Sequence, residues 1–112
     1  MSAADLTGSA PRKILIVGGG GREHALALRL LASPSVEQVI ACPGNAGMDA
    51  QLDSGKTLRS VSADPLDLAR SERVDLVVVG PEVPLVDGLA DRVRALGTPC
   101  FGPSQAAARL EG

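Results

Sequence analysis

Short apolar runs alternate with amphipathic stretches along the chain from residue 13 onward. Most of these runs are rich in Val, Ile and Leu and stop at glycine or proline, which is typical of strands buried on both faces of a parallel sheet. The strands predicted in this way occupy residues 13–17, 36–42, 57–61, 75–79 and 98–101. The third run is the weakest of the five.

The segments between the runs carry apolar side chains at helical spacing. They predict helices over residues 22–32, 64–73 and 85–96, and a last helix that begins at Gln105. Local signals agree with these limits. Asp64 can accept hydrogen bonds from the free N–H groups of the second helix, and Pro65 fits its first position. Gly97 suits the left-handed residue that often follows a helix.

This alternation predicts a parallel sheet, because a helix that crosses back over a sheet joins two strands of the same direction. The expected fold is an open, five-stranded parallel sheet with helices on both faces, a Rossmann-like α/β architecture. Residues 13–112 are expected to form this domain, with an irregular connection over 44–56, and residues 1–12 a flexible tail. The last helix starts so near the end that we expect the chain to be part of a longer one.

Composition narrows the classes of partner. The 112 residues are 45% hydrophobic and 21% charged, as in an ordinary soluble domain. A net charge of −2 and a single aromatic side chain argue against nucleic-acid binding, which needs a basic surface or stacking platforms. No apolar run approaches the roughly 20 residues that span a bilayer, and no secretory signal is visible. We therefore expect a cytoplasmic protein with no membrane contact.

The cysteines and the histidine are too few for a disulfide framework or a zinc site. Cys42 and Cys100 are interpreted as reduced, small and buried side chains. His24 could titrate near neutral pH, although a lone histidine usually packs and bonds locally.

Glycine- and proline-rich clusters follow four of the five predicted strands, at residues 18–24, 43–47, 80–82 and 102–104. The connections that enter the strands are plain by comparison. Ligands of open parallel sheets bind beyond the carboxyl ends of the strands, and glycine lets main-chain N–H groups approach them. A phosphorylated or otherwise anionic small molecule fits such a place. The alternative is that the glycines only make tight turns.

Two standard nucleotide motifs do not fit. The dinucleotide fingerprint needs glycine at its sixth position, and neither Gly18 nor Gly19 as the first position provides it. The acidic residue that should follow the second strand is replaced by Cys42 and Pro43. No Gly-Lys-Ser/Thr sequence follows the glycines, so a kinase-type phosphate loop is absent as well.

Four polar residues in the clusters are candidates for the site. Glu82, between two prolines, could accept hydrogen bonds from sugar hydroxyls or an amine, or be an exposed loop acid. Arg22 could bind an anion or lie on the helix surface. Glu23 could line the site or only stabilise the first turn of the helix. Asn45 is interpreted as a turn residue whose side-chain amide is free for a ligand.

At these residues the sequence resembles the phosphoribosylamine–glycine ligases, also called glycinamide ribonucleotide synthetases, of purine biosynthesis. The resemblance covers nearly all of residues 13–112. It is carried by Gly-Gly-Arg-Glu-His at 20–24, Ala-x-Pro-Gly-Asn-Ala-Gly at 41–47, Asp-Leu-Val-Val-Val-Gly-Pro-Glu-x-Pro-Leu at 75–85, and Cys-Phe-Gly-Pro-Ser at 100–104. Residues 48–59 carry no diagnostic motif.

The resemblance implies an ATP-grasp ligase and, for this chain, the domain that precedes the ATP-grasp domain. In such enzymes ATP activates the carboxylate of glycine as an acyl phosphate. The amine of 5-phosphoribosylamine then attacks it, giving glycinamide ribonucleotide, ADP and phosphate. ATP and Mg²⁺ (or Mn²⁺) are held by later domains of the same polypeptide. The present chain alone is therefore expected to be inactive and to contain no catalytic residue.

The resemblance also implies which residues hold the substrate. The residues that it places along the cleft are Gly20, Gly21, Arg22, Glu23, Asn45 and Gly47, and it places Glu82 against the ribose hydroxyls or the amine. Two other functions stay open. One is the corresponding domain of another ATP-grasp carboxylate–amine ligase, and the other is a stand-alone nucleotide-binding module.

Overall fold

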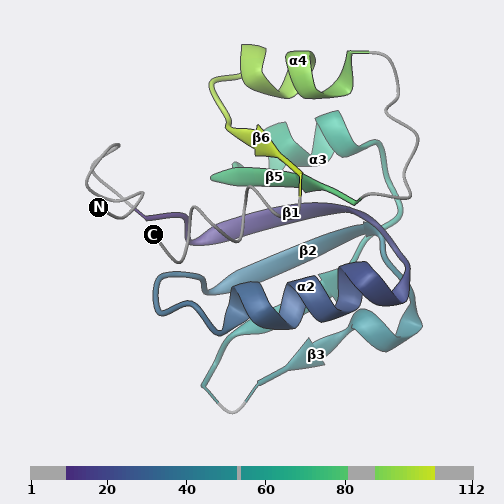
Figure 1. Cartoon of the computed structure of the whole chain (residues 1–112), viewed down its shortest axis with the longest axis vertical. Helices are drawn as coiled ribbons and strands as arrows, with labels where there is room; N and C mark the ends of the chain where they lie inside the picture. Colours follow the sequence, from purple (N-terminus) through teal and green to yellow (C-terminus); the bar gives the residue numbers. More distant parts are fainter. Residues whose placement is uncertain (1–9, 53, 81–87, 103–112) are drawn as a thin grey trace.

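The computed structural model describes residues 10–52, 54–80 and 88–102, and Figure 1 shows their arrangement. The strands are β1 (Lys13–Gly18), β2 (Gln38–Pro43), β3 (Ala50–Gln51), β4 (Thr57–Ser60), β5 (Leu76–Val79) and β6 (Cys100–Phe101). The helices are α2 (Gly21–Leu31), α3 (Pro65–Ser71) and α4 (Leu89–Ala95), with a short 3₁₀ turn η1 (Ala46–Met48).

One sheet with the strand order β3-β4-β2-β1-β5-β6 forms the centre of the molecule. The five strands expected from the sequence pair in parallel. In the register of β1 and β2, Ile16 lies beside Ala41 and Gly18 beside Pro43, so these two strands end together. The α/β class and the parallel pairing of these strands are confirmed.

The sixth strand, β3, differs from the prediction of five. It lies within the segment 44–56, which was expected to be irregular, and pairs antiparallel with β4. A tight turn reverses the chain: the N–H of Leu52 donates to the Lys56 carbonyl at 2.8 Å, and Gly55 has a φ of +89°. Both residues of β3 are exposed, so the strand has no apolar pattern that a sequence could reveal.

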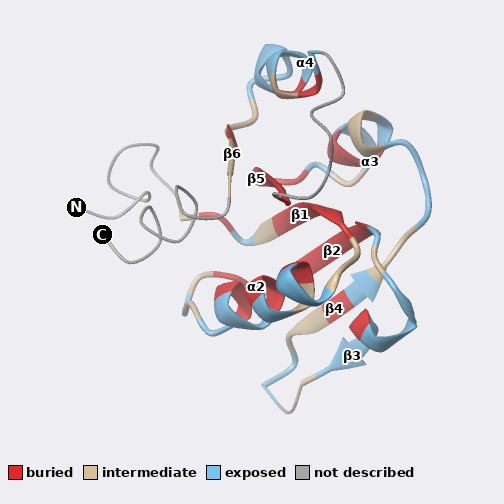
Figure 2. Ribbon diagram, turned by 45° about the vertical axis from the view of Figure 1, so that its right-hand side comes forward, coloured by how far each residue is buried: buried red, intermediate tan, exposed pale blue. Residues whose placement is uncertain are grey.

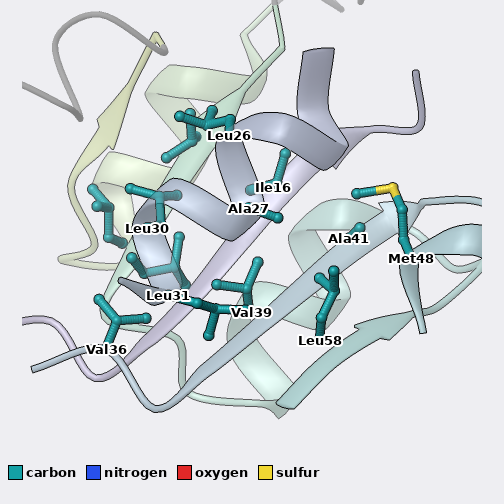
Figure 3. Close-up of a cluster of buried hydrophobic side chains, with 13 residues drawn as sticks. Ile16, Leu26, Ala27, Leu30, Leu31, Val36, Val39, Ala41, Met48 and Leu58 are labelled. Atoms are coloured by element: carbon teal, nitrogen blue, oxygen red, sulfur yellow. The ribbon is translucent and has the colours of Figure 1, made fainter. Parts of the chain in front are cut away.

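Each face of the sheet has its own core. On one face, α2 packs on alternate residues of β1, β2 and β5; Figure 3 shows part of this cluster. On the other face, α3 and α4 pack on the intervening residues of the same strands, such as Leu15 of β1 and Ile40 of β2. Figure 2 shows the central strands β1, β2 and β5 mostly buried and the outer sides of the helices exposed. Helices on both faces are confirmed.

The helix limits agree with the sequence to within a few residues. The Asp64 side chain caps α3 by accepting from the Asp67 N–H at 3.0 Å, and Gly97 has a φ of +87° after α4. Not every apolar side chain of α2 faces the sheet. Leu28 is 46% exposed, because Ala27 faces the sheet in its place. Leu96 is likewise 39% exposed at the end of α4.

The flexible tail predicted for residues 1–12 extends too far along the chain. Pro11 is buried and its carbonyl accepts from Ser35 Oγ at 3.1 Å, and the N–H of Arg12 donates to Asp75 Oδ2 at 2.9 Å. These contacts bind the chain to the start of the sheet before β1. Residues 1–9, the predicted helical residues 85–87 and the helix expected from Gln105 lie outside the described residues.

The chain changes direction across the sheet at β1. It moves from β1 to β2 and β4 on one side, then crosses by α3 to β5 on the other side of β1. The gap between the carboxyl ends of β1 and β5 is therefore the switch point where open α/β sheets bind ligands. We call the edge at which the parallel strands end the carboxyl-end rim, and the opposite edge the amino-end rim.

Candidate functional site at the carboxyl-end rim

Gly19 and Gly20 link Gly18, the last residue of β1, to Gly21, the first residue of α2, at the switch point. Gly20 precedes the helix with an extended backbone, φ −84° and ψ 179°. The N–H groups of Gly21 and Arg22 belong to the first helical turn, where no intrahelical acceptor exists. These N–H groups, with the positive end of the helix dipole, favour an anion at this rim.

The loop after β2 lies directly against this glycine loop. The N–H of Gly44 donates to the Gly18 carbonyl at 3.1 Å. A Cβ atom at Gly19 would lie 2.5 Å from the carbonyl oxygen of Gly44, so a side chain there would collide with backbone. Gly44 itself has a φ of +63°. The two loops are thus brought together as expected, and the contact requires glycine at both places.

Asn45 makes the second connection between the loops. Its Nδ2 donates to the Gly19 carbonyl, and its Oδ1 accepts from the Gly47 N–H at 2.9 Å. The interpretation as a turn residue is confirmed. The expectation of a free amide was wrong, because both amide atoms already hold backbone groups. The Gly47 N–H is likewise engaged within its own loop.

Two residues that the sequence did not single out hold this loop from the side of β4. Ser60 Oγ donates to the Asn45 carbonyl at 2.7 Å, and the Ser60 N–H donates to Asp49 Oδ1 at 2.8 Å. Asp49 follows η1 in the stretch without a diagnostic motif. A serine on a weak strand and an acid in an irregular connection give no sequence signal of this kind.

Glu23 is the buried acidic side chain of the rim, with an exposed fraction of 1%. Its Oε1 accepts from the Gly20 N–H at 2.9 Å, which is half of a capping box because glycine has no side chain to return the bond. A Cβ atom at Gly18 would lie 2.7 Å from Glu23 Cγ, and one at Gly80 would lie 2.8 Å from its Cδ. Glu23 therefore fills the space between the ends of β1 and β5.

The sequence left open whether Glu23 lines the site or only stabilises the first turn of the helix, and these contacts answer part of that question. Its stabilising role in the first turn of α2 is present, and the carboxyl group also joins two strand ends. Direct contact between Glu23 and a ligand stays a prediction.

Arg22 lies beside the glycine loop at the carboxyl-end rim. It is exposed on the first turn of α2. Arg12, Arg59 and Arg94 each pair with a carboxylate, whereas no carboxylate within the described ranges pairs with Arg22. Its guanidinium is thus available to an anion at the helix N-terminus. The neighbouring His24 is half-buried, and its backbone N–H donates to the Gly20 carbonyl at 3.1 Å.

Of the predicted site residues, the structure brings Gly20, Gly21, Arg22, Glu23, Asn45 and Gly47 to one rim. Gly80, at the end of β5, reaches the same place through its contact with Glu23. Glu82 lies outside the described residues, as do Pro103 and Ser104. Their predicted places beside the cleft stay predictions.

The cysteines are confirmed as free and buried. Burial raises the pKa of the Cys42 thiol, which donates to the Ala63 carbonyl at 2.9 Å, and burial also raises the pKa of Cys100. Both side chains are therefore neutral thiols near pH 7. Although Cys42 stands beside the rim, it has no thiolate character to make it a nucleophile.

In the described part of the chain, no three His, Cys, Asp or Glu side chains gather as metal ligands would. None of the described helices has the length and apolar character needed to cross a bilayer.

A shallow cavity of about 300 Å³ lies away from the glycine loops, between the ends of α3 and α4. Arg70 and Arg73 line it together with Leu96 and Thr98. Basic side chains at helix C-termini complement the negative ends of the helix dipoles. We assign this cavity no part in the site.

Comparison with known proteins gives one consistent family. Residues 12–111 match the family model described as the N domain of phosphoribosylglycinamide synthetase. The chain is 51% identical over 104 residues to a phosphoribosylamine–glycine ligase of Allochromatium vinosum, a match that covers 89% of the chain and 24% of that protein. It is 49% identical over 100 residues to the Mycobacterium leprae ligase and 48% over 102 residues to that of Escherichia coli K12, each covering 89% of the chain and 24% of the relative. The chain thus spans about a quarter of the length of these relatives.

Proposed function

This chain belongs to the phosphoribosylglycinamide synthetase N-domain family, and from this premise we propose that it is the substrate-binding amino-terminal domain of a phosphoribosylamine–glycine ligase. The enzyme joins glycine to 5-phosphoribosylamine to give glycinamide ribonucleotide, with ATP converted to ADP and phosphate. It acts in the cytoplasm, in the synthesis of purines. The remainder of the polypeptide binds ATP, with Mg²⁺ or Mn²⁺, and carries the catalytic groups.

The observation that carries the proposal is the meeting of the two glycine-containing loops at the switch point. This meeting places the first-turn N–H groups of α2 beside the guanidinium of Arg22, which has no carboxylate partner in the described part of the chain. N–H donors, a helix dipole and a cation together suit the phosphate of a sugar phosphate. Gly20 and Gly21 allow the ligand to approach the backbone, because they carry no side chain.

The remaining candidate residues act around that phosphate. Asn45 and Gly47 shape the wall of the cleft. Glu82 contacts the ribose hydroxyls or the amine. Glu23 holds the ends of β1 and β5 at a fixed separation beneath the ligand.

The domain contributes to rate by position and not by bond chemistry. Its residues fix the sugar phosphate so that the amine lies beside the activated acyl group. Proximity of this kind lowers the barrier, because the translational freedom of the two reactants is already lost on binding. The chain alone supplies only part of the site. We expect it to bind glycinamide ribonucleotide more weakly than the full-length protein does.

The test is ADP formation by the full-length protein that contains this chain. We expect ADP release to require both glycine and 5-phosphoribosylamine. Release with formate or bicarbonate in place of glycine would instead indicate another ATP-grasp ligase. The absence of substrate-dependent ADP release with all three acids would overturn the proposal.

A paired substitution tests the site itself. Removing a charge-assisted hydrogen bond costs about 1.5–3 kcal/mol, so Arg22→Ala should raise the KM for 5-phosphoribosylamine about ten- to a hundredfold. The matched control is Arg92→Ala, since Arg92 is also exposed on a helix, and that helix packs on the other face of the sheet from α2. An equal change in both variants would remove Arg22 from the site.

A further inference from the structure

We infer that Ser60, supported by Asp49, is a positioning residue that sets the shape of the phosphate-binding rim without touching the substrate. The inference rests on the proposed function and adds two residues to it. Both lie outside the motifs that characterise the family resemblance. Their contacts form a chain of hydrogen bonds that runs from the edge of the sheet to the glycine loop.

The first bond of this chain fixes Ser60. The short strand β3 pairs with β4 only at Leu58 and Thr57, and it does not reach Ser60. Asp49 Oδ1 accepts the Ser60 N–H at 2.8 Å instead. A side-chain carboxylate thereby extends the pairing of β4 beyond Ala50, the first residue of β3, and Ser60 is held at the end of its strand.

The second bond joins Ser60 to the loop after β2 and holds that loop in place. Ser60 Oγ donates to the Asn45 carbonyl at 2.7 Å, and the Met48 N–H donates to the same carbonyl at 2.9 Å. A Cβ atom at Gly44 would lie 2.5 Å from Ser60 Oγ, so the hydroxyl also packs against that glycine. Ser60 thus supports the residues that precede η1 from one side.

The third bond reaches the glycine loop. Asn45 Nδ2 donates to the Gly19 carbonyl, one residue before the N-cap of α2. Gly19 has no side chain through which packing could fix it, and glycine loses the most backbone entropy on ordering. Backbone contact with Gly44 and hydrogen bonds from the neighbouring loop therefore supply the order, and Ser60 is the side chain that supports that loop.

A loop that is ordered before the ligand arrives binds it more tightly, because binding does not have to restrict it. Loss of the Ser60 hydroxyl should therefore weaken binding and leave the chemical step unchanged. The signature is a rise in KM without a matching fall in kcat.

The experiment compares Ser60→Ala with wild type in the full-length protein. We expect the KM for 5-phosphoribosylamine to rise about three- to tenfold, as the loss of one neutral hydrogen bond predicts, with kcat within about twofold. Ser62→Ala is the matched control, since Ser62 is exposed two residues further along the chain, and its KM should stay at the wild-type value. A KM for Ser60→Ala within twofold of wild type would overturn the inference.

Two further variants separate positioning from a general loss of structure. Asp49→Asn keeps the accepting oxygen and should stay close to wild type, whereas Asp49→Ala should resemble Ser60→Ala. In a double-mutant cycle with Asn45→Ala, the Ser60 change should add less than about twofold, because its route to Gly19 is already broken. Fully multiplicative effects would contradict the chain of bonds.

Hydrogen exchange gives a readout that does not depend on activity. Without ligand, the amides of residues 19–23 should exchange faster in Ser60→Ala than in wild type, while those of α4 stay unchanged. If the wild-type protein lacks glycine-dependent ADP formation but this local change appears, the proposed function fails and the positioning role stands. If ADP forms and the local change is absent, only the positioning role fails.

Discussion

The two rims of the sheet are held by different kinds of interaction. At the amino-end rim, charged side chains meet one another or the backbone. Arg12 pairs with Glu37, Glu72 meets Lys13 at 3.4 Å and Arg59 at 3.1 Å, and Asp75 accepts the Lys13 N–H at 3.0 Å. At the carboxyl-end rim, amide, hydroxyl and peptide groups bond to one another, two carboxylates accept from backbone N–H groups, and glycine backbones touch.

This difference teaches how the fold separates stability from binding. Charges that are paired with one another have little attraction left for a ligand. At the carboxyl-end rim the chain holds its loops with amide, hydroxyl and peptide groups, and the carboxylates of Glu23 and Asp49 there accept from backbone N–H groups. The Arg22 guanidinium and the N–H groups of Gly21 and Arg22 are left without a carboxylate partner among the described residues. Substitutions at the two rims should therefore have separable consequences.

The largest expected effect is at Glu23. Glu23→Ala removes a side chain that is 1% exposed and fills the space between Gly18 and Gly80. We expect the free energy of unfolding to fall by about 3 kcal/mol, from the cavity and from the lost acceptor of the Gly20 N–H. Urea unfolding measures it. Glu23→Gln keeps the volume and should lose about half as much or less; equal losses would show that packing does not matter here.

The second effect tests the contact between the loops. In Gly19→Ala the new Cβ would lie 2.5 Å from the Gly44 carbonyl oxygen, so the backbone must shift. We expect a loss of about 1–3 kcal/mol in unfolding free energy. Gly21→Ala is the control, because a Cβ atom there meets no atom within 4 Å. Its stability should equal or slightly exceed that of wild type. Similar losses of unfolding free energy in both variants would contradict the close contact between Gly19 and Gly44.

At the amino-end rim, Glu72→Gln should have a smaller effect. Its ion pairs with Lys13 and Arg59 involve side chains that are 30–45% exposed, and such pairs contribute about 1 kcal/mol or less. The loss should shrink further at 1 M salt, where charges are screened. The KM for 5-phosphoribosylamine in the full-length protein should not change. A raised KM would show that the two rims are not separable.

The smallest effect concerns pH. The hydrogen bond from Arg12, strengthened by its charge, lowers the pKa of Glu37 below its ordinary value. A carboxyl group whose pKa is lower in the folded state adds stability above its unfolded pKa of about 4.3, and loses it as the pH falls through the folded pKa. Glu37→Gln should thus lower the melting temperature slightly at pH 7 and leave it unchanged near pH 2. A difference that persists in acid would assign the effect to another cause.

Much of the fold could be predicted because its signals are local. Val and Ile runs that end at glycine identify the parallel strands, and Asp64 with Pro65 marks the start of α3. The two exposed residues of β3 escape prediction, because their pairing is set by the turn that follows them and not by their own side chains.

The candidate site was predictable as a place but not in its details. Glycines after successive strands indicate that loops gather at one rim. They do not reveal that Asn45 bonds across to Gly19, that Glu23 meets Gly80, or that Ser60 supports the loop. Each of these contacts joins residues far apart in sequence, and only the register of the sheet decides their distance.

The most direct test of the central claim, that the carboxyl-end rim binds the phosphorylated substrate, is hydrogen exchange in the full-length protein with and without glycinamide ribonucleotide. We predict slower exchange in residues 18–24 and 43–47, where the glycine loops meet. Residues 33–38 and 72–76, at the amino-end rim, should exchange at the same rate in both conditions. Protection of the amino-end segments, with none in the glycine loops at saturating ligand, would contradict the account.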